Sequence, residues 1–513
     1  MPSRIQKSVM NAKVNVMFYV ISVVLAFFSR KYFLDNLGTE FLGLSGTLGD
    51  MLNLMNITEL GIGTAVGVTL YKPIFDQDRD KICDIISVFG FLYTRVGSII
   101  AFAGIVLSCF FPMMFTKAGV PLYLVYLMFF SMLYASLLGY FVNYRQIILS
   151  ASQQNYVIML RYNTAVTLKV ILQILTSFLP YNYLWWIALE ALTITVYTFI
   201  LNGTIRKYYP WLQTSYQRGK TKFKEYKELW KKTKQVFVLK LSHLVLNSST
   251  NMLIYAFANL TSVALYGNYN MLMSKVTSFI DGLFTGMEAS VGNLIAEGNI
   301  ENIMKVFNEL LCVRYFMAAL CSITLYFVVS PFISVWLGEK YVMADKIIIL
   351  LSLHFFIQQA RITVDNFKNG YGLFGDVWAP VAEVVLNIGI AVLLGSRYGI
   401  IGILSGLVVS ELLIKMFWKP YYLFTKGFRI PILRYYCPLI LKYVVACLLT
   451  ITGMNYITHY MQTAIHLNSW MSLIVYCTVV GCFTFGLLFS LFFLLDRNML
   501  VFLRHIKEYK AGK

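Results

Sequence analysis

Charged residues are scarce in this chain of 513 residues. Only 13% of the residues are Asp, Glu, Lys or Arg, and 58% are hydrophobic, whereas soluble domains have about 25% charged and about 45–50% apolar residues. Acidic residues are the rarest charged group, with 24 Asp and Glu against 43 Lys and Arg. This composition excludes an ordinary soluble globular fold and predicts a chain that lies mainly in lipid.

Patterns of cysteine and histidine that would bind metal or form a disulfide framework are also missing. The eight cysteines are scattered singly, without a Cys-x-x-Cys pair, and the five histidines show no metal-ligand spacing. We therefore expect small buried thiols, no metal site and no cofactor. Long polar loops on the outer side are absent as well, so no extracytoplasmic domain is expected to carry catalytic residues.

Apolar runs divide the sequence into about fourteen segments, each long enough to cross a bilayer, which needs about 20 residues. The first two lie near residues 14–34 and 44–71. Backbone groups in hydrocarbon need partners within the segment, and no alternating barrel pattern is present, so we predict helices. The expected fold class is an all-α polytopic membrane protein.

The distribution of basic residues predicts the orientation of these helices. With the N-terminus inside, the inner segments contain 31 Lys and Arg, including a segment from Lys415 to Arg434, and the outer segments contain 6. The positive-inside rule then places both termini in the cytoplasm, which suits a protein of the inner membrane. The same rule explains the net charge of +19 without a nucleic-acid partner.

A weak internal repeat follows from a single shift of 221 residues. This shift places Asp78 on Asn299, Asp80 on Glu301 and Asn155 on Asp376. An even number of spans per repeat makes the two halves parallel, with a cavity expected between them. The predicted domains are a six-helix lobe at 1–205, a basic cytoplasmic linker at 206–235, a second six-helix lobe at 236–428, and two extra helices with a cytoplasmic tail at 429–513.

Ionisable residues inside the spans are the candidate functional residues, because each costs about 2.5–3.5 kcal/mol at a helix centre unless it faces a cavity or a partner. Four cations lie deepest and are candidates for lining a substrate cavity: Arg95, Lys169, Lys275 and Arg314. Glu59 and Asp281, each followed within two residues by Gly, are candidates for coupling transport to H⁺ or Na⁺. Pairing with an opposite charge, helix capping or snorkelling at span ends are the structural alternatives for all of them.

Several stretches resemble the polysaccharide flippases of the multidrug, oligosaccharidyl-lipid and polysaccharide exporter superfamily. Two of them are NITELGIGTAVGVTLYKPIFDQDRDKI at 56–82 and VGNLIAEGNIENI at 291–303, and two more lie at 371–413 and 419–428. The resemblance implies lobes of MATE-like architecture and a transporter of undecaprenyl-diphosphate-linked oligosaccharide for surface polysaccharide. It also implies membrane lipids and other polysaccharide assembly proteins as partners.

Two other functions remain open at this point. A multidrug antiporter of the same superfamily would need a more acidic cavity and about twelve spans. A membrane glycosyltransferase or polysaccharide polymerase would need an aqueous loop with acid, base or metal-binding residues, and the longest inner loop here is dominated by lysine. We therefore expect a flippase rather than an enzyme.

Overall fold

The computed structural model describes residues 4–55, 62–116, 119–152, 154–225, 248–284, 291–292, 294–295, 297–373, 375–464, 469–496 and 498–499. The chain forms two compact units, Met1–Ala264 and Leu265–Lys513, and their regular elements are helical throughout the described ranges. Eleven helices in these ranges are long and apolar enough to cross a membrane. The predicted total of about fourteen spans and the predicted domain boundaries remain predictions.

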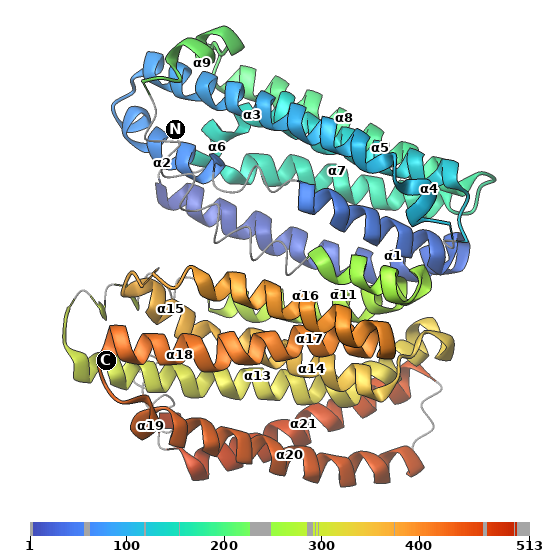
Figure 1. Cartoon of the computed structure of the whole chain (residues 1–513), viewed down its shortest axis with the longest axis vertical. Helices are drawn as coiled ribbons and strands as arrows, with labels where there is room; N and C mark the ends of the chain where they lie inside the picture. Colours follow the sequence, from blue (N-terminus) through green and yellow to red (C-terminus); the bar gives the residue numbers. More distant parts are fainter. Residues whose placement is uncertain are drawn as a thin grey trace. The chain divides into compact units, whose positions relative to one another are not determined.

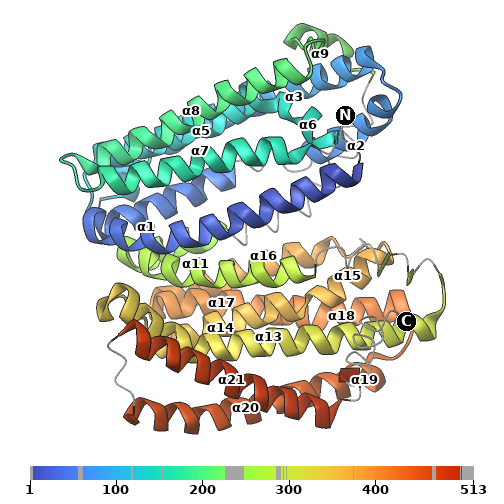
Figure 2. The same cartoon turned by 180° about the vertical axis from the view of Figure 1, so that it is seen from behind.

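Unit 1 is a bundle of helices that run side by side (Figures 1 and 2). Around the bundle, α2 packs on α3, α3 on α5, α5 on α8, α8 on α7 and α7 on α1. The elements of this unit are α1 (Arg4–Met55), α2 (Ile62–Phe75), α3 (Arg79–Ser108), α4 (Phe111–Met114), α5 (Leu122–Phe141), η2 (Asn143–Gln146), α6 (Ile147–Ala151), α7 (Asn155–Thr176), α8 (Asn182–Tyr208) and α9 (Tyr216–Lys222), and the long helix α11 (Leu260–Leu283) begins in it.

The label α1 covers two helical segments that meet at Gly38, where the backbone is not helical. Residues 14–34 and 44–71 were expected as separate spans, and the change of direction at Gly38 separates the first from the start of the second. Gly38 has φ of +80°, a conformation that costs a glycine little and most other residues much more. A single glycine therefore replaces the connecting loop.

Unit 2 continues from α11 and packs α13 against α14, α21 and α20. Its remaining elements are α13 (Ile300–Leu337), η3 (Glu339–Tyr341), α14 (Asp345–Ala360), α15 (Ile362–Gly370), α16 (Trp378–Tyr398), α17 (Ile400–Glu411), η4 (Leu412–Trp418), α18 (Lys419–Tyr422), η5 (Leu423–Phe428), α19 (Ile432–Tyr435), α20 (Cys437–Ala464) and α21 (Trp470–Leu495). η4 and η5 are π-helical. The stretch from α17 to η5 is therefore one continuous helix with wider turns in its second half, which we call the rod. Gly402 and Gly406 face the α16 backbone so closely that an added Cβ would lie within 3 Å of it, so these glycines allow the two helices to pack closely.

The 221-residue shift recurs in the helix starts. α3 begins after Asp78, whose side chain accepts the N–H of Lys81. α13 begins after Asn299, whose side chain accepts the N–H of Asn302. Both pairs of residues are 221 apart, so α3 and α13 begin with the same type of N-cap.

The last two helices belong to the core of unit 2. α20 and α21 share a large apolar cluster with α13. Within it, the ring of Tyr443 stacks on Phe492 at 4.9 Å and its hydroxyl donates to Asp496 at 2.5 Å. The hydroxyl of Tyr476 donates to the Phe327 carbonyl on α13. These contacts bury polar groups that would otherwise be unsatisfied in lipid.

The first part of the basic linker is folded onto unit 1. α9 lies along α3, and Gly219 approaches it so closely that an added Cβ would lie 2.1 Å from the Ser87 carbonyl oxygen. Arg218 donates to Asp84 at 2.5 Å, and this hydrogen bond raises the pKa of the guanidinium. Residues 226–235 of the predicted linker lie outside the described residues.

Candidate functional site

Charged side chains gather inside unit 2, where α14 and α16 pack against the rod formed by α17, η4 and α18. Glu411, the last residue of α17, is the most buried of them, with 1% of its side chain exposed. One of its carboxylate oxygens accepts from Gln358 Nε2 at 2.6 Å and from Lys415 Nζ at 2.8 Å. The other lies 2.8 Å from His354 Nδ1. Three side chains therefore satisfy one buried carboxylate.

Lys415 joins this carboxylate to a second one. Its ammonium group lies 2.9 Å from Glu383 Oε1 on α16, as an ion pair whose angle does not suit a hydrogen bond. Lys415 lies four residues after Glu411, within the π-helical turn η4. π-helical turns are rare and often lie at functional sites. Here the turn places a lysine between two buried carboxylates.

A second charged group adjoins the first. Asp365 on α15 accepts from Lys419 Nζ at 2.7 Å and from Arg361, and the charge of Lys415 also acts on it. At the end of α15, Lys368 pairs with Asp376 at 2.5 Å. We call the residues His354, Gln358, Arg361, Asp365, Glu383, Glu411, Lys415 and Lys419 the unit 2 charge network.

The charges of this network balance. Three carboxylates (Asp365, Glu383 and Glu411) face three cations (Arg361, Lys415 and Lys419), with His354 as the remaining titratable member. Buried charges are tolerated when they are paired and hydrogen-bonded, and removing one partner is costly. A proton on His354 would give the network one positive charge beside Glu411. In the described part of the chain no cluster of His, Cys, Asp and Glu could hold a metal ion.

Comparison with solved structures gives three informative matches. One is a lipid II flippase MurJ in an inward closed conformation, with a TM-score of 0.65 and 17% identity over 93% of this chain and 99% of that chain. Another is an inward-facing multidrug resistance MATE family transporter of the MOP superfamily, with a TM-score of 0.57 and 12% identity over 79% of this chain and 93% of that chain. A MOP superfamily transporter from Pyrococcus furiosus matches with a TM-score of 0.53 and 12% identity over 83% of this chain and 97% of that chain.

The chain has the MurJ/MATE transporter fold. This confirms the predicted all-α membrane fold of MATE-like architecture. No protein-family model and no curated protein matches the sequence. At identities of 12–17% the likeness shows the fold, and the described helices agree with a multi-pass membrane protein.

Arg314 is the most deeply buried of the four predicted cavity cations. It lies on α13 of the MurJ/MATE fold with 3% exposure, and its guanidinium lies 3.7 Å from the centre of the Phe284 ring. Its Nε and Nη1 atoms are buried without a hydrogen-bond partner. The charge of Asp281, a predicted coupling residue that is exposed on α11, acts on this guanidinium. The structure therefore brings two predicted site residues together.

Lys169 has a local partner instead. Its ammonium group on α7 pairs with Glu190 on α8 at 2.9 Å, and Gln173 donates to the same carboxylate at 3.2 Å. The two paired side chains are 18% and 21% exposed. This pair joins two neighbouring helices of unit 1, which is the structural alternative that the sequence left open. Its predicted place in a substrate cavity remains a prediction.

The remaining candidates lie apart from these two sites. Arg95 is exposed on α3 with its guanidinium 5.1 Å from the centre of the Phe91 ring, a cation–π contact. Lys275 is half-buried on α11. Glu59 lies outside the described residues. Arg95 and Lys275 stay predicted cavity residues, and Glu59 stays a predicted coupling residue.

Unit 1 has a polar interior of a different kind. A cavity of about 490 Å³ lies among α3, α5, α6 and α7. Its lining contains aromatic rings and neutral polar groups: Phe89, Tyr93, Ala135, Ser136, Gly139, Tyr140, Tyr144, Gln146, Ile147, Ser150, Asn155 and Ile158. No lining residue is charged.

The sequence reasoning missed two central members of the unit 2 charge network. Lys415 was counted as a loop residue in the orientation rule, and His354 was considered only as a metal ligand. Two signals could have found the site. Glu411 and Lys415 have the i, i+4 spacing of a helical ion pair, and the 221-residue shift places Glu411 on Glu190.

Proposed function

We propose that the protein is a flippase that moves an undecaprenyl-diphosphate-linked oligosaccharide across the cytoplasmic membrane by alternating access, for the assembly of surface polysaccharide. The observation that carries this proposal is the match to MurJ, a lipid II flippase, over nearly the full length of both chains. We name an oligosaccharide as the transported head group because the sequence resembles the polysaccharide flippases. Other polysaccharide assembly proteins are the partners we expect.

The multidrug antiporter is the second candidate, because MATE transporters share the fold. Two observations favour the flippase. The MATE transporter matches 79% of this chain, whereas MurJ matches 93%, and a pair of long helices, α20 and α21, is built into the core of unit 2. In addition, Arg314 offers buried cationic donors, which suit an anionic head group better than an organic cation.

Arg314 is the residue we expect to retain the diphosphate. Its Nε and Nη1 donors are buried and unsatisfied, a state that costs free energy until an acceptor arrives. Phosphate oxygens match the planar fork of a guanidinium. At about 4 Å and an effective dielectric constant of about 20, the attraction amounts to about 4 kcal/mol before desolvation. Arg95 and Lys275 would add charge along the path, while Lys169 is already neutralised by Glu190.

A proton is the coupling ion we propose, with His354 and Glu411 as its acceptor. Sodium would need several free oxygen ligands, and both oxygens of Glu411 already face Lys415, Gln358 or His354. The His354 ring can accept a proton on its second nitrogen while these hydrogen bonds persist. The other charges that face this pair are those of Glu383 and Lys415, and the adjoining group contributes Arg361, Asp365 and Lys419.

The proposed setting is the inner membrane with both termini in the cytoplasm. The excess of basic residues in alternate loops supports this orientation. The polyprenyl tail would then remain in lipid while the diphosphate and sugars cross the membrane.

The proposal can be tested in a bacterial strain whose own polysaccharide flippase has been deleted and replaced by this chain. The readout is the accessibility of the lipid-linked sugar in the outer leaflet. We expect accessibility with the wild type, its loss with Arg314→Ala, and partial recovery with Arg314→Lys, because lysine keeps the charge and loses the fork. Lys340→Ala, which removes an exposed cation from η3, is the matched control and should behave as the wild type.

The same cells distinguish the two candidate functions. Export of a fluorescent organic cation without any change in the lipid-linked sugar would support the antiporter and contradict the flippase. Normal flipping by Arg314→Ala would leave the flippase standing and remove Arg314 from its mechanism.

A further inference from the structure

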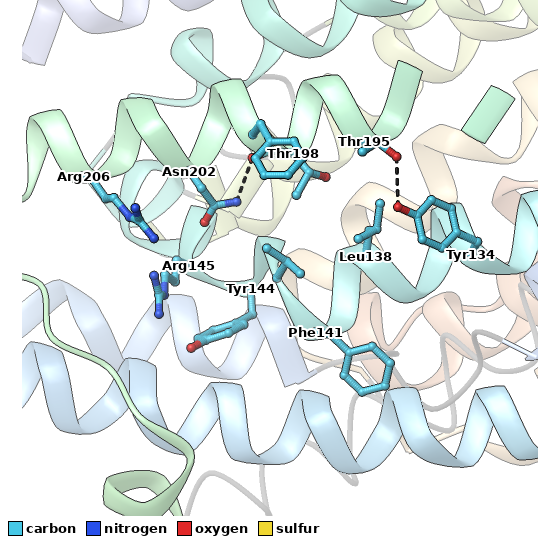
Figure 3. A pocket seen from close by; sticks show the side chains of 11 residues that line it. Tyr134, Leu138, Phe141, Tyr144, Arg145, Thr195, Thr198, Asn202 and Arg206 are labelled. Atoms are coloured by element: carbon cyan, nitrogen blue, oxygen red, sulfur yellow. Dashed lines mark hydrogen bonds between the residues drawn. The ribbon is translucent and has the colours of Figure 1, made fainter. Parts of the chain in front are cut away.

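A second pocket of unit 1 lies between α5 and α8, apart from the neutral cavity described above (Figure 3). Its volume is about 420 Å³, within the range of about 300–1,000 Å³ that is usual for one small ligand. The proposed transport mechanism does not use this pocket. Its lining comprises Tyr134, Leu138, Phe141, Val142, Tyr144, Arg145, Thr195, Thr198, Phe199, Asn202 and Arg206.

Two arginines occupy one end of this pocket, as Figure 3 shows. Arg145 belongs to η2, which follows α5, and Arg206 belongs to the last turn of α8. The Nε atom of Arg145 is buried without a hydrogen-bond partner. The lining contains no Asp or Glu, and neither arginine forms an ion pair with a described residue. This end therefore offers cationic donors and lacks an anion.

The neutral polar groups of the lining are already satisfied by one another. Asn202 Nδ2 donates to the Thr198 carbonyl at 2.9 Å and to Asn143 Oδ1 at 3.1 Å. The hydroxyl groups of Tyr134 and Thr195 share a hydrogen bond of 3.0 Å (Figure 3). The two guanidinium groups are the donors that remain for a ligand.

Apolar side chains form another part of the lining, which is open to the surroundings of the bundle. Phe141 is 39% exposed and Phe199 is 76% exposed. Exposed aromatic rings on a membrane-spanning helix suit contact with lipid chains. Arg145 follows the end of α5 and Arg206 lies in the last turn of α8, so we expect both near the lipid head groups. The pocket thus pairs a cationic end at head-group depth with an apolar wall along the lipid.

We propose that this pocket binds an anionic glycerophospholipid, with its phosphate between Arg145 and Arg206 and an acyl chain along Phe141 and Phe199. Charge complementarity selects a phosphate, for which arginine is the preferred partner. The exposed apolar wall selects a lipid over free phosphate. The volume suits a glycerophosphate head group, whereas a diphosphate that carries several sugars needs more room. The bound phosphate would link η2 to the end of α8, because it would contact Arg145 on the first and Arg206 on the second.

The test uses the purified full-length chain and native mass spectrometry. The chain is titrated with dioleoylphosphatidylglycerol, dioleoylphosphatidylcholine, undecaprenyl diphosphate or inorganic phosphate. We expect one tightly held phosphatidylglycerol and a preference of about tenfold over phosphatidylcholine, which is equivalent to about one charge-assisted hydrogen bond. Inorganic phosphate should not displace this lipid.

Variants decide whether the two arginines form the site. The double variant Arg145→Gln, Arg206→Gln should lose the preference for phosphatidylglycerol. Lys207→Gln is the matched control, because Lys207 is an exposed cation next to Arg206 that does not line the pocket. It should keep the preference. If the double variant fails to fold, the exposed Arg206→Gln alone should weaken the preference.

Three results would overturn the proposal. Equal binding of both phospholipids by the wild type would remove the anionic site. An unchanged preference in the arginine variants, or an equal loss in Lys207→Gln, would assign the binding to general surface charge. Stronger binding of undecaprenyl diphosphate than of phosphatidylglycerol would assign the pocket to the carrier lipid instead. None of these outcomes depends on transport, so the test is independent of the proposed flippase function.

Discussion

Glu190 in unit 1 and Glu411 in unit 2 are 221 residues apart, the same shift that relates the N-caps of α3 and α13. Both carboxylates accept from one lysine and one glutamine. Glu190 is bound by Lys169 and Gln173, both on α7, and is 21% exposed. Glu411 is bound by Lys415 and Gln358, and is 1% exposed.

The difference lies in what surrounds the carboxylate. Glu190 has a partner of opposite charge and no histidine, so its pair is complete by itself. Glu411 has His354 as a third partner and shares Lys415 with Glu383. One repeated position thus serves as a helix–helix link in unit 1 and as the centre of a titratable network in unit 2. In the proposed mechanism, proton coupling therefore takes place in unit 2 and does not involve Glu190.

The largest effect that this comparison predicts is on stability, after removal of the Glu411 carboxylate. Glu411→Leu leaves the network with an uncompensated positive charge, and breaking a buried pair costs about 3–5 kcal/mol. We expect a large drop in the thermal midpoint of the purified chain in detergent. Glu411→Gln removes the same charge but keeps an acceptor for Gln358 and Lys415, so it should lose less stability. An equal or larger loss in Glu411→Gln would contradict the hydrogen-bonded arrangement around this side chain.

Removal of the equivalent carboxylate in unit 1 should cost less. Glu190→Leu breaks a pair that is partly exposed, for which about 1 kcal/mol is expected. The same thermal measurement compares the two variants directly. An equal loss at both positions would show that burial does not distinguish the two carboxylates.

A smaller effect is expected for His354→Asn, which keeps a hydrogen-bond donor beside Glu411 and removes the titratable ring. Flipping in reconstituted vesicles should lose its response to an imposed proton gradient. His459→Asn on the exposed face of α20 is the control and should retain the wild-type response. Equal responses of the two variants would exclude His354 as the proton acceptor.

The smallest effect concerns the N-caps at Asp78 and Asn299. The hydrogen bond from the Lys81 N–H lowers the pKa of Asp78 below its usual value of 3.8. Because the pKa of Asp78 is lower in the folded state, the cap stabilises the fold at pH values above 3.8. This stabilisation is lost as the pH falls through the pKa of the folded state. The cap at Asn299 does not titrate. Hydrogen exchange should therefore show that acidification weakens protection at Lys81 relative to Asn302, and Asp78→Asn should abolish this change.

Much of the fold could be predicted because lipid restricts the choices. Apolar length and the need for internal hydrogen bonds made helices the only suitable element, and Asp78 and Asn299 marked two equivalent helix starts. The form of the connection between the first two spans was not predictable, because only backbone geometry reveals that Gly38 turns the chain by itself.

The candidate site was less predictable. Arg314 was selected as a candidate because a deep cation is costly in lipid, and the structure buries it. Lys415 and Lys419 were assigned to a cytoplasmic loop, because basic residues recur from Lys415 to Arg434. In the structure the rod continues through η4 and α18. Lys415 forms ion pairs with Glu383 and Glu411 inside unit 2, and Lys419 forms one with Asp365. Such pairing depends on contacts between distant segments that hydropathy does not contain.

The most direct measurement is flipping by the purified chain in vesicles. A fluorescent undecaprenyl-diphosphate-linked oligosaccharide is placed in both leaflets, and a membrane-impermeant quencher reports how much label reaches the outer one. We predict that quenching proceeds to completion with the wild type and stops near one half with Arg314→Ala or with empty vesicles. Quenching that stops near one half with folded wild-type protein, at every pH tested, would contradict the flippase.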